Sequence, residues 1–195
     1  MRTIINVVLL LVIIALGWLL ISNIQEPILF KAEKEKREKA VVDQLKQIRT
    51  SMEIYKGIEG KYADNFDSLK YVLKTGQIPL VQVYDDPNDP TGENYIYDTL
   101  YFSAKDSMRT LGISIDSLDY VPYGSEGAEY SIQADTMTYQ STLVDVVEVG
   151  IKRKDFMGPF GDNRFSKYDN SYDPNSVIKF GNLNAPNLSG NWGER

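Results

Sequence analysis

The chain has 195 residues, 43% of them hydrophobic and 25% charged, which is enough for one domain and a further segment. It contains neither Cys nor His, so the usual protein ligands of zinc, haem, iron–sulfur clusters and copper are missing, as are the Ser–His and Cys–His nucleophile pairs. The net charge of −6 is uneven: residues 1–60 carry nine Lys and Arg against seven Asp and Glu, and the remainder carries twelve against twenty. An acidic domain repels phosphates, so we expect no nucleic-acid partner, and no motif suggests a cofactor.

Residues 1–25 are predicted to form a transmembrane signal-anchor. Between Ile4 and Ile24 only four residues interrupt the apolar character, and the run Val7–Ile21 contains no polar side chain. About 20 helical residues cross a hydrocarbon core of about 30 Å. A cleaved signal peptide is the alternative, but no small-x-small site follows the run. We therefore expect one span that stays in the membrane.

The orientation of this span is open to two interpretations. Arg2 precedes it and five basic residues lie within residues 31–39, so a count of positive charges places the domain in the cytoplasm. A span that begins four residues from Met1 is, however, the usual form of an uncleaved signal-anchor. We expect a single-pass inner-membrane protein with its soluble domain in the periplasm.

Residues 26–60 are predicted to form a charged and then amphipathic helix. Glu33–Arg37 and Glu35–Lys39 are spaced i,i+4 in the favourable order, which indicates a solvated first part. An apolar stripe with steps of four and three follows, typical of a helix. It covers about two heptads, too few for a firm coiled-coil prediction, so a face that packs on the domain is favoured over contact between copies. The stripe consists of Val41, Leu45, Ile48, Met52 and Tyr55.

Residues 61–154 are predicted to form a small α+β domain. Asp64 or Asn65 caps a short helix that Gly76 closes. The period then changes to two, which favours antiparallel strands. Residues 155–195 are rich in Asn and Gly, with one short strand expected, and look like a loose or docked tail. The expected strands are Tyr95–Phe102, Ala128–Ala134, Leu143–Ile151 and Val177–Phe180, with Asp116–Val121 as a further candidate.

Part of this arrangement resembles type IV pilins and pseudopilins. The resemblance rests on Gln47-Ile48-Arg49-Thr50, Tyr55, Gly60-Lys61-Tyr62-Ala63 and Leu69, placed after an apolar N-terminal helix. In that family the long helix packs into a filament and a small antiparallel sheet faces outward. The Gly-Phe-x-x-x-Glu processing site of the family does not precede the apolar run.

A second resemblance is to an uncharacterised family of single-span bacterial envelope proteins. It is carried by Ile24-Gln25-Glu26-Pro27-Ile28, by Leu45–Thr50 and by Asp116–Gly124. It implies a membrane anchor and a small α+β domain, and it implies no activity.

Asp-Ser/Thr-apolar triplets occur five times, against roughly one expected from composition. They resemble the acceptor triplet of a bacterial periplasmic O-glycosylation system. The alternative is that Asp and Ser or Thr open helices and turns before apolar runs. The candidate acceptors are Ser68, Thr99, Ser107, Ser117 and Thr136.

Two further groups of residues are candidate sites. Asp85, Asp86, Asp89 and Glu93 form an oxygen-rich stretch that is a candidate for calcium, although two prolines break the alternate ligand spacing and favour a surface turn. Tyr95, Tyr97 and Tyr101 alternate along one expected strand and suggest a stacking face for a sugar or peptide. Packing across the sheet is the alternative for these tyrosines.

No assembled catalytic constellation, P-loop or dinucleotide-binding glycine pattern is present in the sequence. We therefore expect a non-enzymatic, membrane-anchored structural or assembly component of the cell envelope, pilin-like in form. Its expected partners are the membrane and itself or other envelope proteins. A periplasmic glycan- or peptide-binding module that uses the Tyr-rich strand is the alternative.

Overall fold

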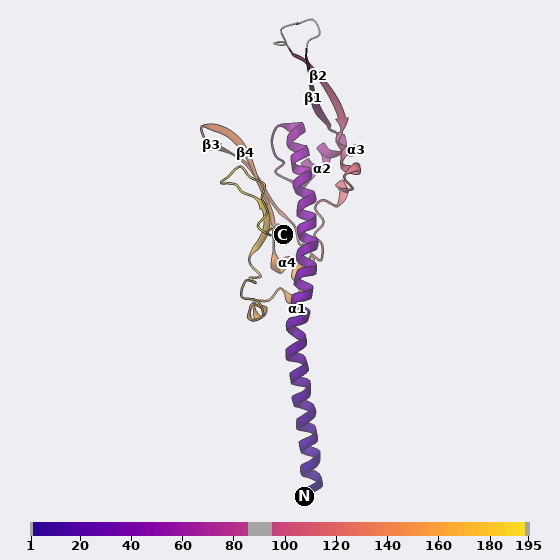
Figure 1. Cartoon of the computed structure of the whole chain (residues 1–195), viewed down its shortest axis with the longest axis vertical. Helices are drawn as coiled ribbons and strands as arrows, with labels where there is room; N and C mark the ends of the chain where they lie inside the picture. The colour runs from indigo at the N-terminus through magenta and orange to yellow at the C-terminus, as the bar shows by residue number, and fades with distance from the viewer. Residues whose placement is uncertain (1, 86–94, 194–195) are drawn as a thin grey trace.

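The computed structural model describes residues 2–85 and 95–193, with the side chains at 2–4, 19 and 21–23 outside the description. The chain is α+β, as predicted: one long helix carries small antiparallel sheets on its C-terminal half (Figure 1). The elements are α1 Arg2–Glu59, α2 Phe66–Thr75, β1 Gln77–Asp85, β2 Tyr95–Ser103, α3 Ala104–Thr110, η1 Ile115–Ser117, β3 Ser131–Tyr139, β4 Thr142–Lys152, α4 Arg153–Met157, η2 Gly158–Phe160, η3 Asn163–Lys167 and β5 Val177–Gly181.

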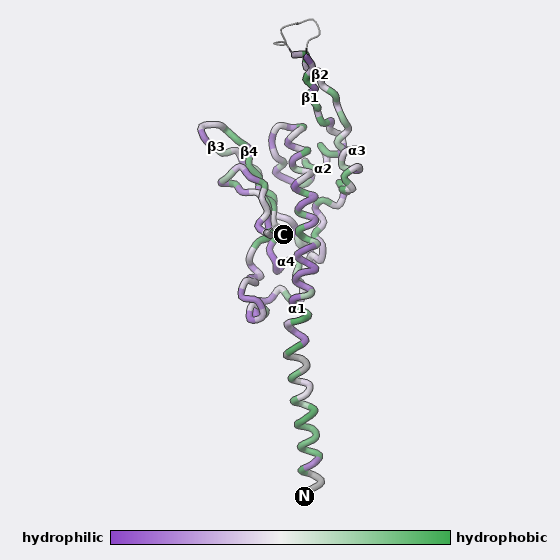
Figure 2. The backbone as a smooth tube through the Cα atoms, in the orientation of Figure 1, coloured by the Kyte–Doolittle hydropathy of each residue, from purple (hydrophilic) through white to green (hydrophobic). Residues whose placement is uncertain are grey.

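The α1 helix is continuous over 58 residues and includes Pro27. Its N-terminal part extends away from the rest of the chain, and the apolar colouring of Figure 2 follows this part. Its C-terminal part is flanked by the other elements, because the apolar stripe on this part needs a covering. Within the described residues, no helix combines the length and the apolar character that a membrane crossing requires.

The short helix α2 begins and ends where the sequence signals place it. The side chain of Asn65 accepts a hydrogen bond from the Ser68 N–H, and Gly76 follows the last turn and donates its N–H to Val72 O. Leu69 and Leu73 are fully buried and fix the helix against α1. Of the two cap residues that the sequence allowed, Asn65 is the one used.

Two separate antiparallel sheets follow. The strands β3, β4 and β5 form a sheet in that order, and β1 pairs with β2 in a hairpin of nine residue pairs from Gln77↔Ser103 to Asp85↔Tyr95. The three-stranded sheet lies along one side of α1, whereas the β1–β2 hairpin projects beyond the C-terminal end of α1 (Figure 1). At the end of β5, Gly181 has φ +78°, and an added Cβ would lie 2.0 Å from Val147 O, so this close approach requires glycine.

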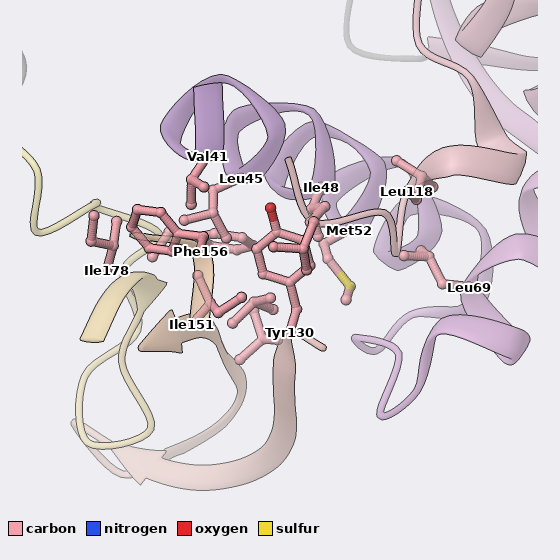
Figure 3. Close-up of a cluster of buried hydrophobic side chains, with 14 of the residues drawn as sticks. Val41, Leu45, Ile48, Met52, Leu69, Leu118, Tyr130, Ile151, Phe156 and Ile178 are labelled. Carbon is pink, nitrogen blue, oxygen red and sulfur yellow. The ribbon is translucent and has the colours of Figure 1, made fainter. Parts of the chain in front are cut away.

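The core lies between α1 and the three-stranded sheet. Val41, Leu45, Ile48 and Met52 have no exposed surface and Tyr55 retains 6%. Figure 3 shows four of them, from Val41 to Met52, opposite side chains from β4, α4 and β5, with Leu69 and Leu118 at one end. The whole stripe is therefore occupied within the chain.

The C-terminal extension contributes to this same core. β5 pairs with β4, Phe165 and Phe180 are fully buried, and Phe180 also bridges to Gly190. The Asn191 side chain accepts from the Lys179 N–H and donates to Val177 O, so the tail is docked on the sheet edge.

One expected strand is wrong. Asp116–Val121 contains the end of a 3-10 helix and a turn, with Ile115 and Leu118 buried three residues apart on one side. Lys74 and Lys70 of α2 pair with Asp116 and Asp119, at 2.5 and 2.6 Å. Buried side chains at a spacing of three fit a helical turn and do not fit a strand, in which every second residue shares a face.

Candidate docking surface

Outside α1, the β1–β2 hairpin carries most of the exposed large hydrophobic side chains of the described residues. Side chains alternate between its two faces, and the register assigns Val81 and Val83 to the same face as Tyr95, Tyr97 and Tyr101. We call this the tyrosine face. All five side chains are exposed, from 53% for Val83 and Tyr95 to 69% for Tyr97.

The opposite face is equally apolar and we call it the aliphatic face. It carries Leu80, Tyr84, Ile96, Leu100 and Phe102. These side chains retain between 38% and 51% of their surface. At the middle of this face Gln82 is paired with Asp98. Asp98 thus places a negative charge among the apolar side chains of this face.

The base of the hairpin is firmly attached. The Ala104 N–H donates to Gly76 O at 3.1 Å, which joins the two ends of the hairpin. The hydroxyl oxygen of Ser103 accepts from the Asp106 N–H and caps α3, and Ala104 and Met108 of α3 are buried. The hairpin thus leaves a fixed base and presents both of its faces to solvent.

Tyr95, Tyr97 and Tyr101 occupy the positions that their spacing predicted, on one face of one strand. Across the strands they face Asp85, Val83 and Pro79 respectively. All three side chains keep more than half of their surface, which shows that no other described element covers them.

The second exposed apolar surface is the N-terminal part of α1. Its described large side chains from Ile5 to Leu16 are each 48–61% exposed, and Trp18 is 77% exposed. Consecutive residues of a helix point in every direction around its axis, so no side of this stretch is covered by the chain.

Between the two surfaces, an aromatic cluster holds the C-terminal loops against α1. Phe30 has no exposed surface and stacks on Phe165 at 5.2 Å between ring centroids. Tyr172 meets Phe30 edge-on at 5.0 Å, and Phe160 and Tyr168 complete the cluster. We call these five residues the aromatic clasp. Burial raises the pKa of Tyr172 to about 12, so its hydroxyl stays protonated and donates to Phe160 O at 2.7 Å.

Polar contacts surround the aromatic clasp. Lys34 Nζ donates to Asp169 Oδ2 at 2.5 Å, and this bond, with those from Ser171, holds the pKa of Asp169 well below its usual range. Arg37 donates to Glu33 at 3.0 Å, as its i,i+4 spacing predicted, and also to Phe156 O at 2.9 Å. The charged part of α1 is therefore only partly solvated, since several of its charges bind the loops.

The candidate calcium residues fall mostly outside the described part of the chain. Asp86, Asp89 and Glu93 belong to the undescribed residues 86–94, and Asp85 is the last residue of β1. Among the described residues, no group of three or more acidic side chains is arranged to hold a metal ion.

The five candidate acceptor residues for O-glycosylation lie in different elements. Three of the triplets end on fully buried residues, namely Leu69, Met108 and Leu118. Within them, the Ser107 and Ser117 hydroxyls donate to backbone carbonyls three or four residues earlier. At these triplets the apolar third residue has a position in the core, as the alternative interpretation expects. Thr99 and Thr136 lie in strands β2 and β3.

Comparison with known proteins identified no relative. No family model, no curated protein and no solved structure matches this chain. Any functional conclusion therefore depends on the geometry of these surfaces.

Proposed function

We propose that the chain is a non-enzymatic structural or assembly component of the bacterial cell envelope. In this proposal the N-terminal part of α1 anchors the chain in the inner membrane. The C-terminal part of α1 and the elements packed on it, which we call the body, lie in the periplasm. The observation that supports it best is the continuity of α1, which runs without a break from a stretch of apolar side chains exposed on every side into the core of the body.

Physical chemistry makes water an unfavourable environment for that stretch. A soluble monomer rarely exposes a contiguous apolar patch of more than a few hundred Å², and the sequence continues the apolar run to Ile21. A lipid environment satisfies the side chains, and an α-helix satisfies its own backbone there. After Arg2, the next charged residue of α1 is Glu26.

The pilin-like part of the proposal is supported by the order of the elements. A long helix, a short capped helix and antiparallel strands follow each other, and the sheet packs on the C-terminal half of the long helix. Since the stripe from Val41 to Tyr55 is buried within the chain, contact between copies has to use other surfaces. In the described part of the chain, the hairpin and the N-terminal part of α1 carry most of the exposed large hydrophobic side chains.

Single-cysteine labelling tests the anchoring and the topology without background, because the chain has no Cys. Leu111 is 55% exposed on the body and Arg2 precedes the apolar run. We expect a membrane-impermeant maleimide to label Leu111→Cys once the outer membrane is permeabilised. Arg2→Cys should be labelled only after the inner membrane is broken, and both variants should remain in the membrane pellet at alkaline pH. Labelling in the reverse order would place the body in the cytoplasm and overturn the proposal.

A glycan- or peptide-binding module is the second candidate, favoured by the exposure of Tyr95, Tyr97 and Tyr101 on one face. Aromatic faces of this kind stack on sugars and on peptide side chains. If it is correct, replacing the three tyrosines by Ala should abolish binding to a glycan or peptide array and leave thermal unfolding of the body unchanged. Retained binding in the triple variant, or lost stability, would argue against it.

A further inference from the structure

The hairpin exposes large apolar side chains on both of its faces. An aromatic side chain offers roughly 150–250 Å² in full, so the ten exposed side chains of the two faces together present on the order of 1,000 Å². The largest patch on a typical monomer is about 300–600 Å², and each partner of a standard protein interface buries about 800 Å². Each face alone presents about half of the hairpin's apolar area, so a contact between one face of each of two hairpins buries about 1,000 Å² in total, which is the lower end of the range for specific interfaces.

A two-stranded hairpin in water is also marginally stable by itself. In antiparallel sheets one face is commonly packed and the other solvated, whereas both faces of this hairpin are apolar. A partner that covered one face alone would leave the other exposed. The arrangement that satisfies both is one in which the hairpin lies between two partners.

We propose that copies of this chain associate through their β1–β2 hairpins, with the tyrosine face of one copy packed on the aliphatic face of the next. This inference rests on the proposed assembly function and names the partner. A contact of this kind joins two different surfaces, so each copy keeps one of the two free for a further copy. Repetition of the contact generates a closed ring or an open array. Every interior copy then has both faces buried.

The charges of the hairpin favour this pairing over the two symmetric ones. The described strands contain two acidic residues, Asp85 and Asp98, and no Lys or Arg. Two aliphatic faces in contact would bring one Asp98 near the other, and like charges in a buried contact are costly. Two tyrosine faces in contact would leave both aliphatic faces in water. The mixed contact offers the hydroxyl groups of Tyr97 and Thr99 as donors to Asp98, which gives a buried carboxylate the partners it requires.

The geometry of α1 also favours a second copy as the partner. Helical residues rise 1.5 Å each, so the part of α1 from Glu26 to its end lifts the base of the hairpin by about 50 Å. Copies anchored in one membrane share this height and the same direction of the helix. Their hairpins therefore meet at one level, and anchoring in two dimensions raises their effective concentration.

Disulfide trapping in membranes that contain the full-length chain tests the inference. Val81 lies on the tyrosine face and Leu100 on the aliphatic face. When Val81→Cys and Leu100→Cys chains with different tags are produced together, mild oxidation should give a mixed dimer carrying both tags. A chain with both substitutions should give a ladder of higher oligomers. Leu111→Cys is the control for random collision, since it is exposed outside the hairpin, and we expect its yield to be at least tenfold lower.

Three results would overturn the inference. One is a mixed-dimer yield no greater than that of the Leu111→Cys control. Another is dimers from Val81→Cys alone or from Leu100→Cys alone at the yield of the mixed pair, which would indicate symmetric contacts. The third is crosslinking of the hairpin cysteines mainly to a different protein, identified by mass spectrometry, which would make the chain an adaptor.

A disrupting variant and a fractionation step complete the test. Tyr97→Asp places a charge on the tyrosine face and should reduce the mixed dimer at least tenfold, while thermal unfolding of the body stays that of the parent. An unreduced yield in this folded variant would count against the contact. If the chain is in the membrane and the hairpins do not crosslink, the inference fails and the anchoring proposal stands. Crosslinked hairpins in a chain found outside the membrane would support the hairpin contact and overturn the anchoring proposal.

Discussion

Replacing Leu45 and Ile48 together by Asp is expected to unfold the body. Both side chains are fully buried between α1 and the sheet. Truncation of a buried Leu or Ile costs about 2–5 kcal/mol each, and a buried, unpaired carboxylate adds to that cost. The sum is comparable with the total stability of a domain, about 5–15 kcal/mol, so no folded population should remain.

The measurement is urea unfolding of the full-length chain in detergent, followed by fluorescence. The chain has two Trp, and Trp192 packs against the core, so a Trp18→Phe background leaves Trp192 as the single reporter of the body. Lys46→Asp is the matched control, because it adds the same side chain at an exposed position next to Leu45, and it should cost no more than about 1 kcal/mol. An unchanged unfolding midpoint in the double variant would show that the stripe is not the packing face of α1.

Phe30→Ala should detach the C-terminal loops from α1 at the aromatic clasp. Phe30 is fully buried and its ring meets those of Phe165, Tyr172, Phe160 and Tyr168. Removal of a buried Phe side chain costs about 3–5 kcal/mol. Because Phe30 is the first buried residue along α1, ahead of the stripe that begins at Val41, we expect a large part of this loss to appear as local opening of residues 158–172.

Hydrogen exchange of the full-length chain measures this effect. In Phe30→Ala the amides of residues 158–172 should exchange at least tenfold faster, with little change in α2. The control is Leu29→Ala, which removes a neighbouring side chain that is 56% exposed on the same helix and should leave the exchange rates as they are. Equal protection of the loops in the Phe30 variant and the parent would show that Phe30 is not needed to hold them against α1.

The elements that the sequence predicted well are those with a strong local signal. The stripe on α1, the Asn65 cap and the Gly76 stop of α2 all depend on residues within one or two turns of each other. The strand β4 extends one residue beyond each predicted end, and β5 extends one residue beyond its predicted C-terminal end. The strand β3 is displaced toward the turn at Gln140 and Ser141, both of which have positive φ. A two-residue turn with positive φ at both positions suits a tight hairpin, although Gln and Ser give little signal for it.

The elements that sequence reasoning missed lack such a signal. β1 is apolar on both faces, so it shows no alternation, and Pro79 within it argues against a strand. Tyr95, Tyr97 and Tyr101 were recognised as a face, but the equal apolar character of the opposite face emerges only from the pairing of the two strands. The aromatic clasp joins Phe30 to residues more than 120 positions away, and no local pattern indicates such a contact.

Because α1 is unbroken, the number of its residues sets both the height of the body along the helix axis and the direction in which the body points around that axis. In a continuous helix each residue adds about 100° of rotation and 1.5 Å of rise. One residue inserted between Trp18 and Phe30 would therefore turn the whole body about the helix axis by roughly a quarter of a circle, with almost no change in height. Seven inserted residues, nearly two turns, would lift the body by about 10 Å and restore its azimuth to within about 20°. The number of helical residues between Trp18 and Phe30 thus sets the direction in which the hairpin points about the helix axis, relative to the N-terminal part of α1.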